Sequence, residues 1–320
     1  MSDPSVSIPS PAPAPMIAPD KTGYETTPDG YRLRFAVFRS LKRPNKGTIV
    51  LLHGRNEAIE KYDETIADFI AAGFDVGTFD WRGQGKSDRL VANAQRGYIE
   101  DFEQFAIDLE HIFTQVILPE TRAPFFMVGH SMGGLAALYA APRMANRIRR
   151  MVLSAPLLGL HEDVPSATIL APASKALCFL GLGAMPVSRG SDGIAENPFL
   201  NNRLTTDPVR YARNQTLGGP QGVLNLGPPT FAWLNATYRA IEYVTRIEHM
   251  ARLHIPTLMV TAGADTVVES LASENYARNL RSGAHLTIDG ARHELMQEAD
   301  VYRDQFMAAV HAFIPGTSLS

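Results

Sequence analysis

A serine set between two glycines is the residue of this sequence best suited to nucleophilic chemistry. Residues 129–133 read Gly-His-Ser-Met-Gly, which fits the Gly-x-Ser-x-Gly pattern of a nucleophile elbow. An apolar run precedes them at residues 125–128, and an alanine-rich segment follows at residues 134–140. In a sharp turn from strand to helix, such a serine is exposed near a helix N-terminus. We therefore predict that Ser131 is a nucleophile rather than a solvated serine in an ordinary turn.

A serine hydroxyl is a weak nucleophile at neutral pH and needs a base, commonly a histidine oriented by a carboxylate. In this structural context the expected chain order is serine, then acid, then histidine. Asp265 follows an apolar run at residues 255–261, and His293 follows another at residues 284–288. Both side chains are thus expected just beyond the ends of strands. We predict Asp265 as the orienting acid and His293 as the base.

Other acids and histidines fit these roles less well. Asp289 is very close in sequence to His293, whereas the acid and the base of this order come from separate loops. His285 falls within a predicted strand and His311 within a predicted helix, so both are interpreted as structural or surface residues. His53 precedes the nucleophile and ends a strand, which favours a structural hydrogen-bonding role.

Attack on an ester carbonyl creates an oxyanion, and losing one of its hydrogen-bond donors typically costs about 3–4 kcal/mol. The backbone N–H of Met132, directly after the nucleophile, is expected to be one donor. The second is expected from residues 53–57, where Gly54 allows a turn that faces the Arg55 N–H toward the serine. Residues 80–87 carry glycines but lack the Walker spacing, so we interpret them as a tight wall of the active site.

The elements that must position these residues alternate along the chain. Amphipathic helices are expected over residues 59–70, ending near Gly73, over residues 102–116, stopping at Pro119, and over residues 302–313. Apolar strands between helices indicate an α/β fold, with a mainly parallel central sheet covered by helices on both faces. The expected strands are residues 31–37, 48–52, 74–79, 125–128, 151–153, 255–261 and 284–288.

One region breaks this alternation and suggests an insertion. Residues 157–243 show no clear strand and are interpreted as a mostly helical lid over the carboxyl ends of the strands, where ligands of α/β proteins bind. The core is then formed by residues 21–156 and 244–320. Residues 1–20 are rich in Pro, Ser and Ala and are interpreted as a flexible tail.

Composition narrows the class of protein. The 320 residues are 45% hydrophobic, which allows one large α/β domain with an insertion. The net charge of −3 gives no indication of a nucleic-acid partner. No His, Cys and Asp residues have metal-ligand spacing, so no metal or other cofactor is expected. The single cysteine, Cys178, stands in an apolar stretch and is expected to be a small buried residue; a reducing, cytoplasmic location is the simplest interpretation.

Five short segments together resemble one family. They are residues 53–57 with 61–62, 80–85, 129–134, 263–265 and 290–294. From about Tyr24 to Phe313 the chain resembles α/β-hydrolases of the monoacylglycerol lipase and bacterial lysophospholipase group, often labelled serine aminopeptidase-like. Residues 202–207 and 210–211 also resemble the lysophospholipase branch.

The resemblance implies the same roles as above: Ser131 as nucleophile, Asp265 as acid, His293 as base, and Arg55 and Met132 as oxyanion donors. Arg55 stands where monoacylglycerol lipases usually have a small residue, which favours the bacterial branch.

We therefore expect a serine hydrolase that cleaves carboxylic esters of acyl lipids through an acyl-enzyme. The alternatives are an aminopeptidase or another small-substrate enzyme of this fold, and a non-catalytic ligand-binding protein. Apolar residues of the predicted lid, among them Leu180, either line an acyl tunnel or form the lid's own core. Arg55 and Glu57 either contact a polar head group or form a structural salt bridge. The expected partner is a small-molecule acyl ester, with transient contact to a membrane surface through the lid and no obligate protein partner.

Overall fold

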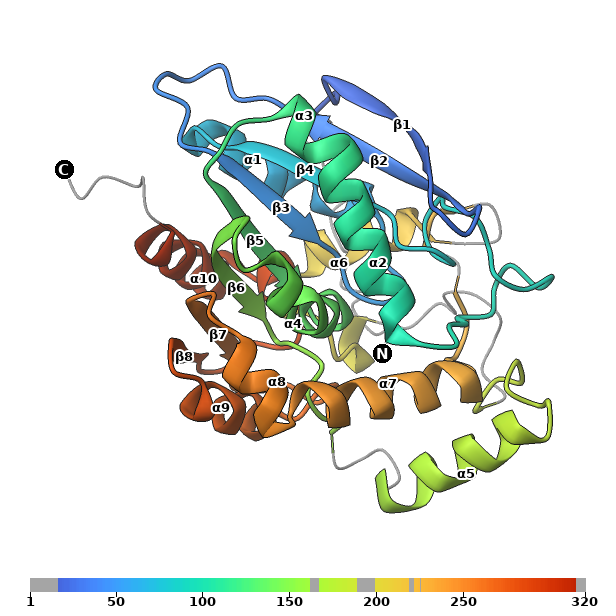
Figure 1. The fold of residues 1–320 in the computed structure, drawn as a ribbon. Helices are drawn as coiled ribbons and strands as arrows, with labels where there is room; N and C mark the ends of the chain where they lie inside the picture. Colours follow the sequence, from blue (N-terminus) through green and yellow to red (C-terminus); the bar gives the residue numbers. More distant parts are fainter. Residues whose placement is uncertain (1–16, 162–166, 189–198, 219–221, 225, 315–320) are drawn as a thin grey trace, which may run out of the picture.

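A single eight-stranded sheet runs through the molecule (Figure 1), in the order β1-β2-β4-β3-β5-β6-β7-β8. The structure is a computed structural model and describes residues 17–161, 167–188, 199–218, 222–224 and 226–314. β1 and β2 form an antiparallel hairpin, β2 pairs antiparallel with β4, and all further pairs are parallel. The strands are β1 (Lys21–Thr26), β2 (Arg32–Phe38), β3 (Thr48–Leu52), β4 (Asp75–Phe79), β5 (Phe125–His130), β6 (Ile148–Ser154), β7 (Thr257–Ala262) and β8 (Gly283–Ile288).

The central strands are buried over their whole length, which explains their continuous apolar runs. Every residue of β3, β4 and β5 is buried, as expected for parallel strands covered on both faces. The register aligns the carboxyl ends of three neighbours: Leu52 pairs with Gly129, and Gly129 pairs with Leu153. Loops after these strands therefore meet at one edge of the sheet.

Helices cover both faces of the sheet. α2 (Phe102–Ile112), α4 (Met132–Met144) and α9 (Ser270–Asn279) contribute to the apolar core on one face. α1 (Asp63–Ala72), preceded by η1 (Ile59–Tyr62), and α10 (Asp300–Phe313) pack on the other face. The predicted fold class, with a mostly parallel sheet between helices, is confirmed.

Two local expectations need correction. The helix expected to stop at Pro119 continues from α2 through η2 (Phe113–Ile117) into α3 (Leu118–Glu120), because Pro119 lies in the first turn of α3, where a proline is tolerated. β1 was not expected from the sequence. It is an edge strand whose residues are exposed or half-buried, so it has no apolar run to reveal it.

The segment interpreted as a lid is helical in its described part. It contains α5 (Ala167–Phe179), η3 (Phe199–Asn201), α6 (Pro208–Thr216) and α7 (Phe231–Val244), followed by α8 (Ile247–Arg252). Among the described residues of 157–243, only isolated β-bridges occur. α5 lies against α7 at the periphery, away from the sheet (Figure 1). Most of the predicted tail, residues 1–16, lies outside the described residues.

Candidate active site

Ser131 occupies the turn between β5 and α4 in a strained backbone conformation. Its φ is +50° and its ψ is −116°, values that residues with a Cβ rarely adopt. Gly133 is required here because a Cβ on it would lie 2.5 Å from the carbonyl oxygen of His53. The Ser131 N–H donates to the Ser154 carbonyl (3.0 Å), and its own carbonyl accepts from Leu157 (3.1 Å). The turn is thus fixed by its neighbours, and Ser131 remains 8% exposed, at the wall of a cavity.

Asp265 and His293 are brought together from separate loops, after β7 and β8 respectively. Asp265 Oδ2 lies 2.8 Å from His293 Nδ1, and both residues are buried. Asp265 Oδ1 accepts from the N–H groups of Val267 (2.7 Å) and Val268 (3.0 Å). Burial alone would raise the pKa of Asp265, but its hydrogen bond and charge interaction with His293, together with the two N–H donors, lower that pKa below its usual value.

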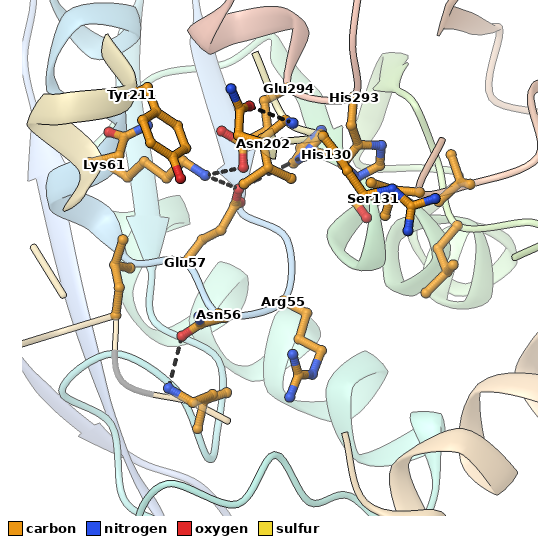
Figure 2. A pocket seen from close by; sticks show the side chains of 18 of the residues that line it. Arg55, Asn56, Glu57, Lys61, His130, Ser131, Asn202, Tyr211, His293 and Glu294 are labelled. Atoms are coloured by element: carbon orange, nitrogen blue, oxygen red, sulfur yellow. Dashed lines mark hydrogen bonds and ion pairs between the residues drawn. The ribbon is translucent and has the colours of Figure 1, made fainter. Parts of the chain in front are cut away.

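Ser131, His130 and His293 line one cavity of about 560 Å³ (Figure 2). The rings of His130 and His293 have centroids 4.8 Å apart. Burial lowers the pKa of His130 to about 3, so this imidazole is neutral at physiological pH and does not repel a protonated His293. The first residue of α4, Met132, presents an N–H that has no intrahelical acceptor, as at any helix N-terminus.

A buried charge cluster lies on the same cavity wall, and sequence reasoning did not assemble it. Lys61 Nζ lies 2.6 Å from Glu57 Oε1 and 2.6 Å from Glu294 Oε1 (Figure 2). Glu57 Oε2 also accepts from the Gly54 N–H (2.5 Å) and from the Tyr62 hydroxyl (2.7 Å). Burial opposes ionisation of Glu57, but the charge and hydrogen bond of Lys61, together with the Tyr62 hydroxyl, hold its pKa well below the usual range.

The cluster favours one of the two interpretations left open for Glu57. Its carboxylate lines the cavity and is bound by Lys61 and by the Gly54 N–H, which supports a structural ion pair; a contact of Glu57 with substrate stays a prediction. The sign of this cluster in the sequence is that Glu57 and Lys61 are four residues apart. Nothing in the sequence places Glu294 beside them, because that contact spans more than two hundred residues.

Arg55 follows Gly54 in the same loop but has very different surroundings. Its Nη2 donates to the Gly227 carbonyl, and its guanidinium lies 5.4 Å from the ring centre of Trp233. Its Nε is buried without a hydrogen-bond partner. Burial lowers the pKa of Arg55 to about 10, which still leaves it charged at neutral pH.

The remaining wall of the cavity comes from residues 157–243. Its apolar side chains include Leu160, Leu224, Leu226 and Trp233. Leu180, for which a place in an acyl tunnel and a place in the lid's own core were the two alternatives, fits neither: it lies just beyond α5, is 67% exposed and is absent from the cavity lining. α5 packs on α7 at the periphery (Figure 1), and none of its described residues lines the cavity.

The weaker candidates lie elsewhere. Asp289 is exposed and does not line the cavity. His285 contacts Thr261 Oγ1 (2.9 Å), and His311 packs on Phe69, in line with their structural interpretation. His53 Nδ1 lies 2.7 Å from the Gly54 carbonyl oxygen and is likewise structural.

Two further expectations need correction. Residues 80–87 do not form a wall of the cavity but support it from behind, since Gln84 Oε1 accepts from the N–H of Asn56 (2.7 Å). Cys178 is half-buried rather than fully buried, because α5 lies at the periphery. In the described part of the chain, no three His, Cys, Asp or Glu side chains are grouped to hold a metal ion, and no helix has the length and apolarity needed to cross a membrane.

The fold and the strained serine at the end of β5 define an α/β-hydrolase. The chain belongs to the family described as serine aminopeptidase, S33, whose model matches residues 43–300. The predicted resemblance is thereby confirmed.

Curated relatives align over most of their own length. Lysophospholipase L2 of Escherichia coli is 29% identical over 300 residues, which cover 89% of this chain and 84% of the relative. Probable lysophospholipase L2 of Haemophilus influenzae is 27% identical and 87% of each chain is covered. Monoglyceride lipase of Rattus norvegicus is 29% identical, and the alignment covers 81% of this chain and 80% of the relative.

Solved structures show the same fold. A soluble variant of monoglyceride lipase from Saccharomyces cerevisiae, in complex with a substrate analog, superposes with a TM-score of 0.76 at 20% identity, covering 98% of this chain and 100% of that one. A thermostable carboxyl esterase from Bacillus coagulans, in complex with glycerol, gives a TM-score of 0.73 at 21% identity, covering 93% of this chain and 98% of that one.

Proposed function

We propose that this protein is a serine hydrolase that cleaves the carboxylic ester of single-chain acyl lipids, lysophospholipids or monoacylglycerols, through an acyl-enzyme. The observation that carries the proposal is the buried Asp265–His293 hydrogen bond on the same cavity as the strained Ser131. The curated relatives are named lysophospholipase L2 and monoglyceride lipase, which supports this substrate class.

In the proposed mechanism, His293 uses the ring nitrogen not bound to Asp265 to take the proton of the Ser131 hydroxyl. The Ser131 oxygen attacks the ester carbonyl carbon, and the carbonyl oxygen becomes an oxyanion held by the N–H groups of Met132 and Arg55. The carbon–oxygen bond to the glycerol breaks, and His293 gives the proton to the leaving alcohol. Water, deprotonated by His293, then attacks the acyl-enzyme and releases the fatty acid and Ser131.

Asp265 keeps the imidazole in the required tautomer and stabilises its charged form. The low pKa of Asp265 supports this role, because a carboxylate that stays ionised pairs with the imidazolium formed in each step. Residues 157–243, the proposed lid, supply the apolar wall for the acyl chain. The exposed Phe179 and Leu180 near the end of α5 support the proposal that this region touches a membrane surface transiently. A cytoplasmic location fits the single cysteine.

An aminopeptidase activity is less well supported. A substrate with a free amino terminus needs a carboxylate that can accept its ammonium group. In the described lining of the cavity, the Glu57 and Glu294 carboxylates both bind Lys61.

A panel of substrates tests the proposal. Short p-nitrophenyl esters, a long-chain monoacylglycerol, a lysophosphatidylcholine and an amino-acid anilide are assayed with wild type, Ser131→Ala and Ser270→Ala. Ser270 is a matched control because its hydroxyl donates to the Ala262 carbonyl (3.0 Å) and does not line the cavity. We expect ester turnover in wild type and Ser270→Ala and none in Ser131→Ala. Anilide turnover without ester turnover would favour the aminopeptidase, and no turnover at all would favour a binding protein.

A further inference from the structure

Arg55, which is half-buried with a fully buried Nε, differs from three other enclosed cationic side chains. Arg34 pairs with Glu60 and Asp80, and Arg82 pairs with Asp29 and Asp108. Lys61, on the same cavity as Arg55, likewise binds two carboxylates.

Among the residues that the structure describes, no carboxylate pairs with Arg55. Its contacts are one backbone carbonyl, at Gly227, and the face of Trp233. A buried charge without a counter-charge is costly, and so is a buried N–H without an acceptor. The protein holds this guanidinium in the cavity wall with its Nε unsatisfied. Such a group is suited to receive an anion supplied by a ligand.

The chain is built to keep the guanidinium in this position. Gly97 leaves the space for it, since a Cβ there would lie 2.7 Å from Arg55 Nη2. Asn56, directly after Arg55, adopts a φ of +56° and accepts from the Leu226 N–H through its Oδ1 (2.9 Å). The loop that carries Arg55 is therefore fixed both to residues 226–227 and to the sheet.

The reach of the side chain matches the spacing in one substrate class. Five atoms separate the backbone nitrogen of Arg55, a proposed oxyanion donor, from its guanidinium carbon. Five atoms also separate the ester carbonyl carbon of a lysophospholipid from its phosphorus. We infer that Arg55 binds the phosphodiester of the substrate's head group and makes this enzyme prefer lysophospholipids over uncharged monoacylglycerols. This inference rests on the proposed ester-hydrolase function of the same site.

The chemistry of the two groups agrees. A guanidinium offers five N–H donors in a planar fork that fits two phosphate oxygens, and charge-assisted hydrogen bonds are stronger than neutral ones. A monoacylglycerol has the same ester and glycerol carbons but no anion, so it leaves the buried charge unpaired. Discrimination therefore arises from the head group alone when the acyl chain is kept constant.

The test compares two substrates within each variant. kcat/KM is measured for 1-acyl lysophosphatidylcholine and for 1-monoacylglycerol of the same chain length, below their critical micelle concentrations. The variants are Arg55→Met, Arg55→Lys and Arg89→Met. Arg89 is a matched control, a partly buried arginine that donates to backbone carbonyls, including that of Gly85 (2.8 Å), and lies outside the cavity lining.

The ratio of interest is kcat/KM for the lysophosphatidylcholine divided by kcat/KM for the monoacylglycerol. We expect Arg55→Met to lower this ratio about 10- to 100-fold, the effect of losing hydrogen bonds to a charged group. Arg55→Lys, which keeps a positive charge, should recover part of the ratio, and Arg89→Met should leave it within about twofold. Glycerophosphocholine should inhibit wild type more strongly than glycerol does, and Arg55→Met should lose this difference. If the methionine variant is poorly folded, the lysine variant and the inhibition by glycerophosphocholine still give the answer.

Three results would overturn the inference. Arg55→Met could lower kcat/KM for both substrates by the same factor, which is the behaviour of an arginine that only holds the loop against residues 226–227. The ratio could also fall equally in Arg89→Met. Inorganic phosphate could inhibit through Arg55 while the ratio stays unchanged, which would indicate a free-anion site. If wild type hydrolyses neither lipid, the proposed function fails instead, so the two failures are distinguishable.

Discussion

The two walls of the cavity are built in different ways. The wall formed by the loops after β3, β5, β7 and β8 carries buried polar groups, nearly all of which are bound to one another, such as the Asp265–His293 pair and the Lys61 cluster. The wall formed by residues 157–243 combines apolar side chains, such as Leu226 and Trp233, with uncharged polar ones, such as Asn202 and Gln215, and with Arg203.

This difference separates reaction chemistry from substrate selection. Groups that must hold sub-ångström positions come from the sheet edge, where register and burial fix them. The wall from residues 157–243 is joined to this edge through side-chain and backbone contacts. Arg210 and Arg213 of α6 bind Glu64 of α1, and the Glu294 N–H donates to the Leu204 carbonyl (2.8 Å). Changes on the sheet side should therefore alter rate and stability strongly, and changes at the far edge of the proposed lid should alter them little.

The largest effect is expected for Asp265→Asn. An amide cannot hold the imidazole in the correct tautomer or stabilise its charged form, so kcat for a p-nitrophenyl ester should fall about 10⁴-fold. The control is Asp289→Asn, an exposed residue outside the cavity lining, which should stay near wild type. A loss of less than tenfold in Asp265→Asn, with intact circular dichroism, would remove Asp265 from the proposed mechanism.

Lys61→Met probes the balance of charge on the sheet side. It leaves the buried carboxylates of Glu57 and Glu294 without their shared cation, and breaking a buried pair typically costs about 3–5 kcal/mol. The free energy of unfolding, measured by urea denaturation, should fall by this amount. Lys86→Met, which removes a half-exposed ion pair with Glu60, should cost less than about 1 kcal/mol. Equal costs in the two variants would show that the cluster does not stabilise the sheet side.

Glu64→Gln weakens the connection between α6 and α1. The hydrogen bonds of Arg210 and Arg213 outweigh burial and lower the pKa of Glu64 from 4.5 to about 2. A lowered carboxyl pKa contributes stability above the unfolded value of 4.5, and this contribution is lost as the pH falls toward 2.

At pH 7, Glu64→Gln should lower the free energy of unfolding by about 1 kcal/mol, and its Tm by about 2–4 °C. The difference from wild type should shrink by pH 3. A difference that is the same at both values of pH would contradict the assigned role of the carboxylate.

The smallest effect is expected at the end of α5. Phe179 is 90% exposed, so Phe179→Ser should change stability by less than about 0.5 kcal/mol and leave short-ester turnover within about twofold. Trp233→Ala, on the buried side of the same region, should cost about 3–5 kcal/mol. A large loss of short-ester turnover in Phe179→Ser would show that α5 takes part in the site after all.

Sequence patterns predict the sheet side of this molecule better than they predict residues 157–243. β3 and β5 show continuous apolar runs because they are buried on both faces, and the spacing around Ser131 follows from the steric demands of one turn. The pairing of Asp265 with His293, the proposed acid and base, could be predicted because chain order constrains which loops meet. The place of Leu180 could not be predicted, since an apolar residue at the end of a peripheral helix has the same sequence pattern as one that lines a tunnel.

The contrast between Glu57 and Arg55 was also beyond the sequence. Both are charged residues of one loop, and both were assigned the same pair of alternatives. Glu57 has a charged partner because Lys61 lies four residues after it, and this lysine also binds Glu294, which only the folded chain brings near. Among the described residues, no carboxylate does the same for Arg55. Local spacing therefore predicts the sharp turn at Ser131, whereas the balance of charge in the cavity is a property of the tertiary structure.

The central claim is that the Ser131 oxygen attacks an acyl carbon while His293 and Asp265 support it. The most direct measurement is the reaction of the purified protein with a fluorophosphonate that carries an alkyl chain, followed by intact-mass spectrometry and peptide mapping. We predict one adduct per chain, on the peptide that contains Ser131, much slower labelling in Asp265→Asn and none in Ser131→Ala. An adduct on any other residue, or labelling that persists in Ser131→Ala, would contradict the account.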